Sequence, residues 1–186
     1  MNAVLVDVTD LVEFLWRQES VSGVQRVIAE VAPLLGDLAP TGFVVFDRQR
    51  GVFVALTSGE ISTVIARGAQ AESSATRAEL AQAAKTMLER ARSADSVDMS
   101  GGTTLVFLGA LWINDALMMA ARLAHLQGAA IVSLLYDLTP VMEGEHTAAV
   151  NRLFERYLNF LLQCADRVPA ISQSSRRAFE DYARSR

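Results

Sequence analysis

Short apolar runs and amphipathic segments alternate from the start of the chain. Residues 3–6 are apolar and rich in valine, and they lead into Asp7-Val8-Thr9-Asp10, which predicts a first strand followed by a loop. From residue 24 to residue 35, hydrophobic side chains recur three and four positions apart, the spacing of one face of a helix. This pattern predicts an amphipathic helix that ends before Gly36.

The next part of the chain combines a hairpin pattern with a long polar stretch. Two β-rich runs, residues 43–46 and 52–56, are joined by polar residues with the composition of a hairpin connection. Residues 58–100 are polar and rich in alanine, and within them we expect one helix from about residue 76 to residue 94. Because residues 68–74 have the composition of a flexible stretch, we expect this insertion to be the least ordered part of the chain.

Two continuous apolar runs mark the middle of the chain. Residues 104–108 and 130–136 show no alternation with polar residues, which is typical of strands buried on both faces of a parallel sheet. Residues 114–127 lie between them and have a helical pattern that closes at Gly128. A right-handed crossover is the expected connection.

The last part of the chain repeats this order. We expect a helix at about residues 147–165, a short strand at residues 167–171, and a last helix that Ser172 opens as its N-cap. Strands that alternate with helices predict an α/β fold, a Rossmann-like, doubly wound, mainly parallel sheet with helices on both faces. A length of 186 residues suits a single domain of this kind, residues 1–186.

Composition and charge narrow the classes of function. A net charge of −4 and a pI of about 5.2 argue against a nucleic-acid partner, since a duplex-binding surface needs clustered Lys and Arg. The lone Cys164 lies in an apolar helical stretch, and without a signal peptide the sequence favours the cytoplasm. Arg122, Asp137 and Glu143 interrupt the longest apolar runs, which fall short of the ~18 residues needed to cross a bilayer. The sequence also lacks the motifs of dinucleotide enzymes, P-loop NTPases, zinc enzymes and serine hydrolases.

Polar segments follow the predicted strands, at the edge where an open parallel sheet binds its ligands. These segments are residues 7–23, 109–114, 137–146 and 172–175. The sequence therefore predicts a ligand crevice at this edge.

Each candidate in these segments has a functional and a structural interpretation. Gly23 at a helix start favours a phosphate or another anion, but Ser22 also suits a simple N-cap. Asp137 ends a buried strand, where it either serves the site or stabilises the turn. Ser172 either binds a hydroxyl-rich or anionic ligand or only caps its helix. His146 stands alone among acidic neighbours, which is far from a metal-ligand set, so no metal is expected.

The order of four segments resembles a known family. Asp7-Val8-Thr9-Asp10, Ser22-Gly23-Val24-Gln25-Arg26-Val27, Tyr136-Asp137-Leu138-Thr139-Pro140 and Ala170-Ile171-Ser172-Gln173-Ser174-Ser175 follow one another as in the N-terminal domain of bacterial GT-B glycosyltransferases. The most similar type is the retaining, mannosyltransferase-like group that assembles O-antigen or capsular polysaccharide. The markers run from residue 7 to residue 175, so the resemblance spans nearly the whole chain.

This resemblance implies roles for seven residues. It implies that the loop at Ser22 and Gly23 approaches the donor diphosphate and that Arg26 lies near the cleft or braces this loop. It implies further that Asp137 is a catalytic group on the acceptor side, between its neighbours Tyr136 and Thr139. Ser172 would border the groove between two domains.

The chain departs from the family pattern in two respects. The family usually carries His where this chain has Tyr136, so a role of that His does not transfer. The family's nucleotide-sugar-binding domain, with its paired glutamates, would follow residue 186, and no Glu-x7-Glu pair occurs in the sequence.

Taken together, the resemblance implies the acceptor-binding half of a glycosyltransferase. Such an enzyme moves a mannose-like hexose from a nucleotide sugar to a lipid-linked glycan or a growing surface polysaccharide, with no cofactor besides its donor. We expect no sugar transfer by the isolated chain, and we expect contact with the inner face of the membrane, toward which Arg152 and Arg156 share one helical face. Two alternatives stay open, a free-standing nucleotide- or glycan-binding subunit and a non-catalytic scaffold.

Overall fold

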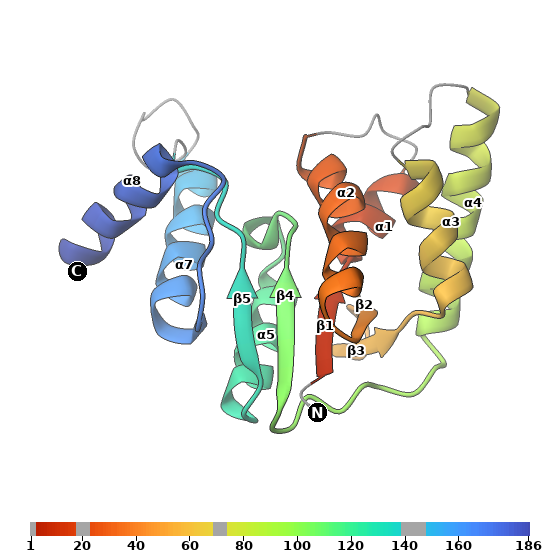
Figure 1. The fold of residues 1–186 in the computed structure, drawn as a ribbon, viewed down its shortest axis with the longest axis horizontal. Helices are drawn as coiled ribbons and strands as arrows, with labels where there is room; N and C mark the ends of the chain where they lie inside the picture. The colour runs from red at the N-terminus through yellow and green to blue at the C-terminus, as the bar shows by residue number, and fades with distance from the viewer. Residues whose placement is uncertain (1–2, 18–22, 69–73, 139–147) are drawn as a thin grey trace.

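A five-stranded sheet forms the centre of the computed structural model (Figure 1), which describes residues 3–17, 23–68, 74–138 and 148–186. The sheet has the order β3-β2-β1-β4-β5, in which β1, β2, β4 and β5 are parallel and β3 runs antiparallel to β2. The strands are β1 (Ala3–Asp7), β2 (Thr41–Asp47), β3 (Val52–Ala55), β4 (Thr103–Phe107) and β5 (Ala130–Ser133). The predicted hairpin is confirmed, and its turn contains Gly51 at a φ of 70°.

Helices cover both faces of this sheet, which confirms the predicted doubly wound α/β class. One face packs against α1 (Thr9–Trp16), α2 (Gly23–Leu38), α3 (Ser58–Gly68) and α4 (Ser74–Ala91). The other face packs against α5 (Asp115–Leu126), α7 (Ala148–Cys164) and, at its margin, α8 (Gln173–Arg184). A 3-10 turn, η1 (Leu111–Ile113), joins β4 to α5.

Each face has its own apolar core. Alternate residues of a strand point to opposite faces, so Leu105 and Phe107 of β4 join the α5 side while Val106 joins the α1–α4 side. The α5 side also contains a group of four aromatic rings whose centroids lie 5.6 to 6.1 Å apart: Trp112, Tyr136, Phe154 and Tyr157. Continuous apolar strands are thus buried from both sides, as their sequence predicted.

The prediction of a loop after β1 was wrong. Thr9 begins helix α1 directly, and Leu11, Val12 and Leu15 of this helix are buried in the core. The segment is only 8 residues long, so it shows barely two turns of helical periodicity. Tertiary packing of its apolar face stabilises it.

The predicted end of the second helix at Gly36 was also wrong, because α2 continues to Leu38. Glycine ends a helix where the backbone turns to a positive φ. Positive values occur at Gly51, Gly102 and Gly128 among the described residues, and Gly36 keeps a helical backbone. Gly128, by contrast, follows α5 at a φ of 98°, as predicted for that helix end.

The segment 58–100 is more ordered than predicted. It contains two helices, α3 and α4, where the sequence analysis expected one. Leu80 and Met87 of α4 are 1% and 3% exposed, and Arg90 of α4 binds Glu60 of α3 through two hydrogen bonds of 2.6 and 2.9 Å. One face of this alanine-rich helix therefore belongs to the core. The expected flexible stretch at residues 68–74 lies mostly outside the described residues.

Irregular segments pair with both outer strands of the sheet. At one side Val97 donates its backbone N–H to Phe53 of β3 at 2.8 Å. At the other side, the predicted strand at residues 167–171 forms only isolated bridges beside β5, and Leu135 donates to the Pro169 carbonyl at 2.8 Å. Pro169 has no N–H to donate, so a regular strand is not completed there.

Candidate functional site at the carboxyl ends of β1 and β4

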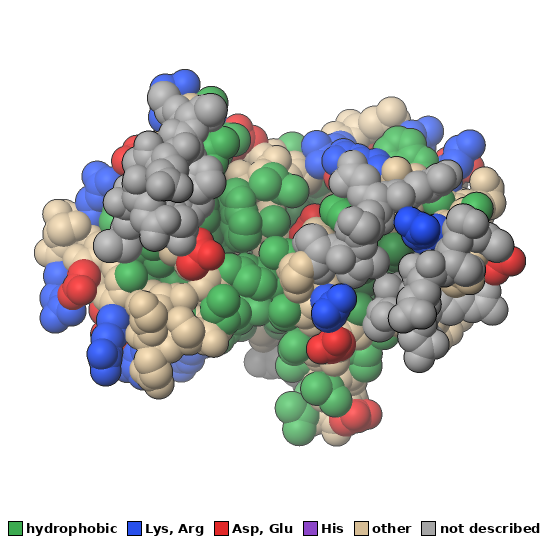
Figure 2. All heavy atoms as spheres, turned by 90° about the horizontal axis from the view of Figure 1, so that it is seen from above, with side chains coloured by type: hydrophobic (Ala, Val, Ile, Leu, Met, Phe, Trp, Pro, Cys, Tyr) green, Lys and Arg blue, Asp and Glu red, His purple; other side chains and the backbone are tan. Residues whose placement is uncertain are grey.

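The order of the strands creates one crevice at their carboxyl ends. From β1 the chain moves to β2 on one side, and from β4 it moves to β5 on the other. The connections leave β1 and β4 in opposite directions, so a crevice opens between them, at the place where sheets of this type bind ligands. Figure 2 looks onto this edge and shows hydrophobic side chains gathered at its middle.

Asp10 joins three segments at this crevice. Its Oδ2 accepts a hydrogen bond from the backbone N–H of Ala110 and another from Nε2 of Gln25, both at 3.0 Å. Burial raises the pKa of Asp10, and these two hydrogen bonds oppose that shift. A Cβ on Gly109 would lie 2.8 Å from the Asp10 Cβ, so the close approach of β4 to Asp10 requires glycine.

Tyr136 joins the other segments of the crevice. Its hydroxyl donates to the Leu108 carbonyl at 2.6 Å and lies 3.5 Å from the Val24 carbonyl, while its own carbonyl accepts from the Ser175 hydroxyl at 2.6 Å. Burial, and then the negative charge of Asp10, raise the pKa of Tyr136, so its phenol stays protonated and remains a donor. Tyr136 thus fixes the ends of β4 and β5 to the first turns of α2 and α8.

Asp7 lies below Asp10, at the end of β1, and is buried. Its Oδ1 accepts a hydrogen bond of 2.5 Å from the Thr9 hydroxyl, which itself accepts from the backbone N–H of Phe46 at 2.8 Å. Burial raises the pKa of Asp7 from 3.8 to about 7, although the hydrogen bonds from Thr9 act against this shift. Near neutral pH this carboxyl therefore exists in both its protonated and its charged form.

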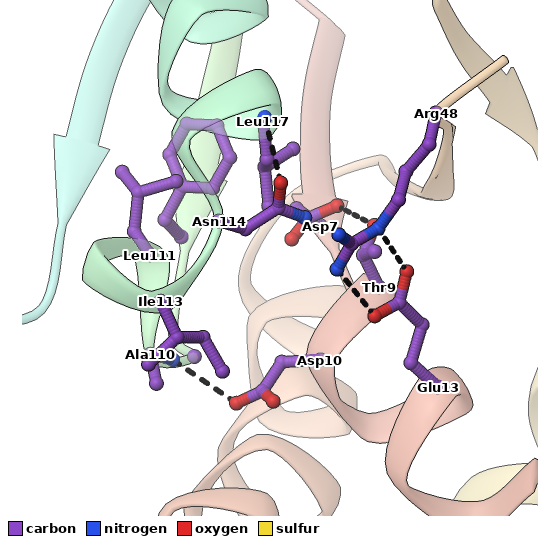
Figure 3. A pocket seen from close by; sticks show the side chains of 12 residues that line it. Asp7, Thr9, Asp10, Glu13, Arg48, Ala110, Leu111, Ile113, Asn114 and Leu117 are labelled. Carbon is purple, nitrogen blue, oxygen red and sulfur yellow. Dashed lines mark hydrogen bonds and ion pairs between the residues drawn. The ribbon is translucent and has the colours of Figure 1, made fainter.

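An ion pair stands at the mouth of the crevice beside Asp7 (Figure 3). Arg48 donates from Nε and from one terminal nitrogen to the two oxygens of Glu13, each at 2.8 Å. This paired geometry is the strong, directional form of an Arg–carboxylate contact. Figure 3 shows the pair on the far side of Thr9 from the η1 turn, so it forms one wall of the small cavity below.

The structure places the predicted site residues at different depths of this edge. Gly23 is the exposed first residue of α2, and Arg26 is exposed one turn later. Asp137 is exposed directly after Tyr136. Ser172 is the N-cap of α8, as predicted, and accepts from the Ser175 N–H at 3.0 Å. Ser22 and Thr139 lie outside the described residues, as does His146.

Sequence reasoning included the buried Asp7 and the half-buried Asp10 only as part of a motif and gave them no role. Asp7 and Asp10 follow the apolar run of β1, and this position at a strand end was the signal available. Asn114, 5% exposed, was noted only as the end of a polar segment. Their burial depends on α1 and η1, neither of which was predicted.

The described residues contain no group of three metal-binding side chains among His, Cys, Asp and Glu. Within the same ranges no helix combines the length and apolar character that a membrane crossing requires. Cys164 is a buried free thiol.

Fold and crevice define the class of this protein: a Rossmann-like α/β domain whose polar strand ends meet at a topological switch point. Comparison with known proteins adds no narrower class. The chain matches no protein-family model, no curated protein and no solved structure.

Proposed function

We propose that this chain is the acceptor-binding part of a GT-B glycosyltransferase that moves a mannose-like hexose from a nucleotide sugar to a glycan. One observation carries the proposal. Polar contacts join the four segments that resemble the family motifs: Asp10 accepts a hydrogen bond from Gln25, the Tyr136 carbonyl accepts one from Ser175, and the Tyr136 hydroxyl lies 3.5 Å from the Val24 carbonyl. These contacts gather residues from four distant parts of the chain around one crevice.

The chemistry of transfer suits this arrangement. Glycosyl transfer passes through an oxocarbenium-like state and needs an acceptor hydroxyl held close to the leaving diphosphate. In the proposal, the exposed carboxylate of Asp137 serves the acceptor hydroxyl, and the N-terminal end of α2 at Gly23 favours the negative diphosphate. Arg26, exposed on the same helix, adds positive charge near that end. The donor would bind in a second domain that the resemblance implies.

The alternative is a binding subunit that holds a nucleotide or a glycan without catalysis. It is favoured by the topology, because open α/β sheets bind ligands at this switch point whether or not a reaction follows. In both cases we also propose that the protein lies at the inner surface of the membrane. Arg156, one of the two arginines expected to face the membrane, forms an ion pair with Asp115 at 2.8 Å, which reduces the positive charge of that face.

A binding and transfer experiment tests the proposal. Isotope-labelled chain is titrated with a mannose oligosaccharide and, separately, with a nucleotide sugar, while backbone amide signals are followed. The oligosaccharide should shift the signals of Ala110 and of residues next to Tyr136 and Asp137. Joined to a donor-binding domain, the wild-type chain should transfer sugar, and Asp137→Ala should lose transfer while it keeps its fold.

Asp37→Ala is the matched control, because Asp37 is an exposed carboxylate near the opposite end of α2. Wild-type transfer by Asp137→Ala would remove Asp137 from the site. Shifts caused by the nucleotide sugar alone would favour the binding-subunit alternative.

A further inference from the structure

A small cavity lies at the carboxyl ends of β1 and β4, and the ion pair of Glu13 and Arg48 forms one of its walls. We call it the Asp7 chamber (Figure 3), and Asp7, Thr9 and Asn114 supply its inner polar groups. Its volume is about 20 Å³. A water molecule needs roughly 10–15 Å³ measured in this way, so the chamber has room for one oxygen-sized group but not for a sugar ring.

Asn114 contributes an unused donor to this chamber. It is 5% exposed, and its Oδ1 caps α5 by accepting the Leu117 N–H at 3.1 Å. This bond fixes which end of the amide is oxygen, so its NH2 group points toward Asp7 (Figure 3). Within residues 3–17, 23–68, 74–138 and 148–186, this NH2 group has no hydrogen-bond acceptor. The NH2 group is open to the chamber, so it is available to donate to a further group there.

Asp7 supplies the complementary acceptor. It is 3% exposed and lines the same chamber, and its described side-chain partner is Thr9, at 2.5 Å. The only proton of the Thr9 hydroxyl is used in this contact, since its oxygen accepts from Phe46. The remaining lone pairs of Asp7 are therefore available to a group inside the chamber.

The donor and the acceptor together select the chemistry of the occupant. A hydroxyl group both accepts and donates, so it satisfies the Asn114 NH2 and the Asp7 carboxyl at once. An anion would meet Asp7, Asp10 and Glu13, three acidic side chains that line the cavity. These three do not form a group that could hold a metal ion, and a methyl group would leave the Asn114 donor unpaired.

We propose that the Asp7 chamber binds one hydroxyl group between Asp7 and Asn114, supplied by the acceptor glycan when the crevice is occupied and by water when it is empty. The glycan part of this inference rests on the proposed function, and the water part does not. In this arrangement Asp7 and Asn114 are positioning residues, which select a glycan by a hydroxyl at one ring position. An analogue without that hydroxyl would leave both buried groups unpaired.

High-resolution crystal structures of the chain, with and without methyl α-mannoside, test the site directly. Without the sugar, we expect a water oxygen within hydrogen-bond distance of both the Asp7 carboxyl and Asn114 Nδ2. With the sugar, we expect one of its hydroxyls in the same place. A direct bond from Asn114 Nδ2 to Asp7, with no oxygen between them, would overturn the inference.

Affinity measurements distinguish sugar binding by the Asn114 NH2 group from the capping of α5 by its Oδ1. Asn114→Ser keeps a good helix N-cap but removes the NH2 group, so methyl α-mannoside should bind about tenfold more weakly without a comparable loss of stability. Among the monodeoxy analogues of methyl α-mannoside, one should bind wild-type protein about tenfold more weakly than the parent sugar does. Asn114→Ser should not weaken the binding of this analogue any further. Asp115→Asn is the control, since Asp115 is the exposed next residue and should not affect binding.

The outcomes distinguish this inference from the proposed function. If all monodeoxy analogues bound as well as the parent sugar and Asn114→Ser had no effect, the acceptor-hydroxyl site would be wrong while glycan binding stood. If no sugar bound but the chamber held the expected water, the hydroxyl site would be supported and the acceptor function rejected.

Discussion

Two aspartates that look alike in the sequence have different surroundings in the structure. Asp7 and Asp137 both follow an apolar run, yet Asp7 is 3% exposed and Asp137 is exposed at the rim. The pattern of strands predicted the edge at which both lie. It did not predict their depth, because depth depends on α1 and η1, which pack over the end of β1 and are too short to show a clear period.

The depth of Asp7 makes stability depend on pH. In the folded state burial raises the pKa of Asp7 to about 7, whereas the unfolded value is near 3.8. Between these values the folded protein binds more protons than the unfolded chain, so this contribution to stability is present below pH 4 and is lost as the pH rises to 7. In the wild-type protein, this effect should lower the free energy of unfolding by roughly 4 kcal/mol between pH 4 and pH 7. Asp7→Asn should not show this fall, and urea unfolding of both proteins at pH 4, 5.5, 7 and 8.5 measures the difference.

Asp98 should change stability with pH in the opposite direction to Asp7, so Asp98→Asn serves as the comparison. Hydrogen bonds from Ser100 lower the pKa of Asp98, which is exposed, so its contribution is present above the unfolded pKa and is lost as the pH falls. A stability difference between wild type and Asp7→Asn that stays constant from pH 4 to pH 7 would contradict the assignment of Asp7.

At the scale of the elements, the sequence predicted the long and strongly periodic ones. The strands at residues 104–108 and 130–136 and the helix at residues 114–127 were confirmed, with small shifts at their ends. One error falls on residues 167–171, where the predicted strand forms only isolated bridges. The others fall on α1 and α3, and at Gly36. Composition suggested a loop or a break there, and packing of apolar side chains overrides it.

The contrast between Gly36 and Gly128 can be measured. Gly36 lies inside α2 with open space around its Cβ position, so Gly36→Ala should raise the free energy of unfolding by about 0.5–1 kcal/mol. Gly128 has a φ of 98°, which a residue with a Cβ adopts only at a cost. Gly128→Ala should therefore lower the free energy of unfolding by about 1–2 kcal/mol. Thermal unfolding of the two variants checks both signs, and destabilisation by Gly36→Ala would show that α2 ends where the sequence predicted.

For the whole molecule, one sheet separates two apolar cores. Every buried hydrophobic residue of the strands belongs to one core or the other, so loss of packing on one face disturbs strands that also form the other core. Residues 58–100 contribute α3 and α4 to one of these cores and are thereby part of a single cooperative unit. Composition alone suggested a poorly ordered insertion, because it does not reveal which alanines face a neighbouring helix.

A cavity in one core should therefore weaken the other. Leu80→Ala removes a side chain that is 1% exposed in α4 and should cost about 2–5 kcal/mol. In a Trp16→Phe background, the fluorescence of Trp112 reports the opposite core, and its midpoint in urea should fall together with the circular dichroism signal. Lys85→Ala, on the exposed face of α4, should leave both midpoints in place. An unchanged Trp112 midpoint in Leu80→Ala would indicate two independent units.

The segments beside the outer strands have a consequence for behaviour at high concentration. An open strand edge is a template for intermolecular pairing, and proteins suppress aggregation by covering or interrupting such edges. Here Val97 binds the backbone of β3 on one side, and Pro169 lies in the segment that binds beside β5 on the other. Because irregular segments partly cover both outer strands, concentrated native protein should resist growth into fibrils by strand addition.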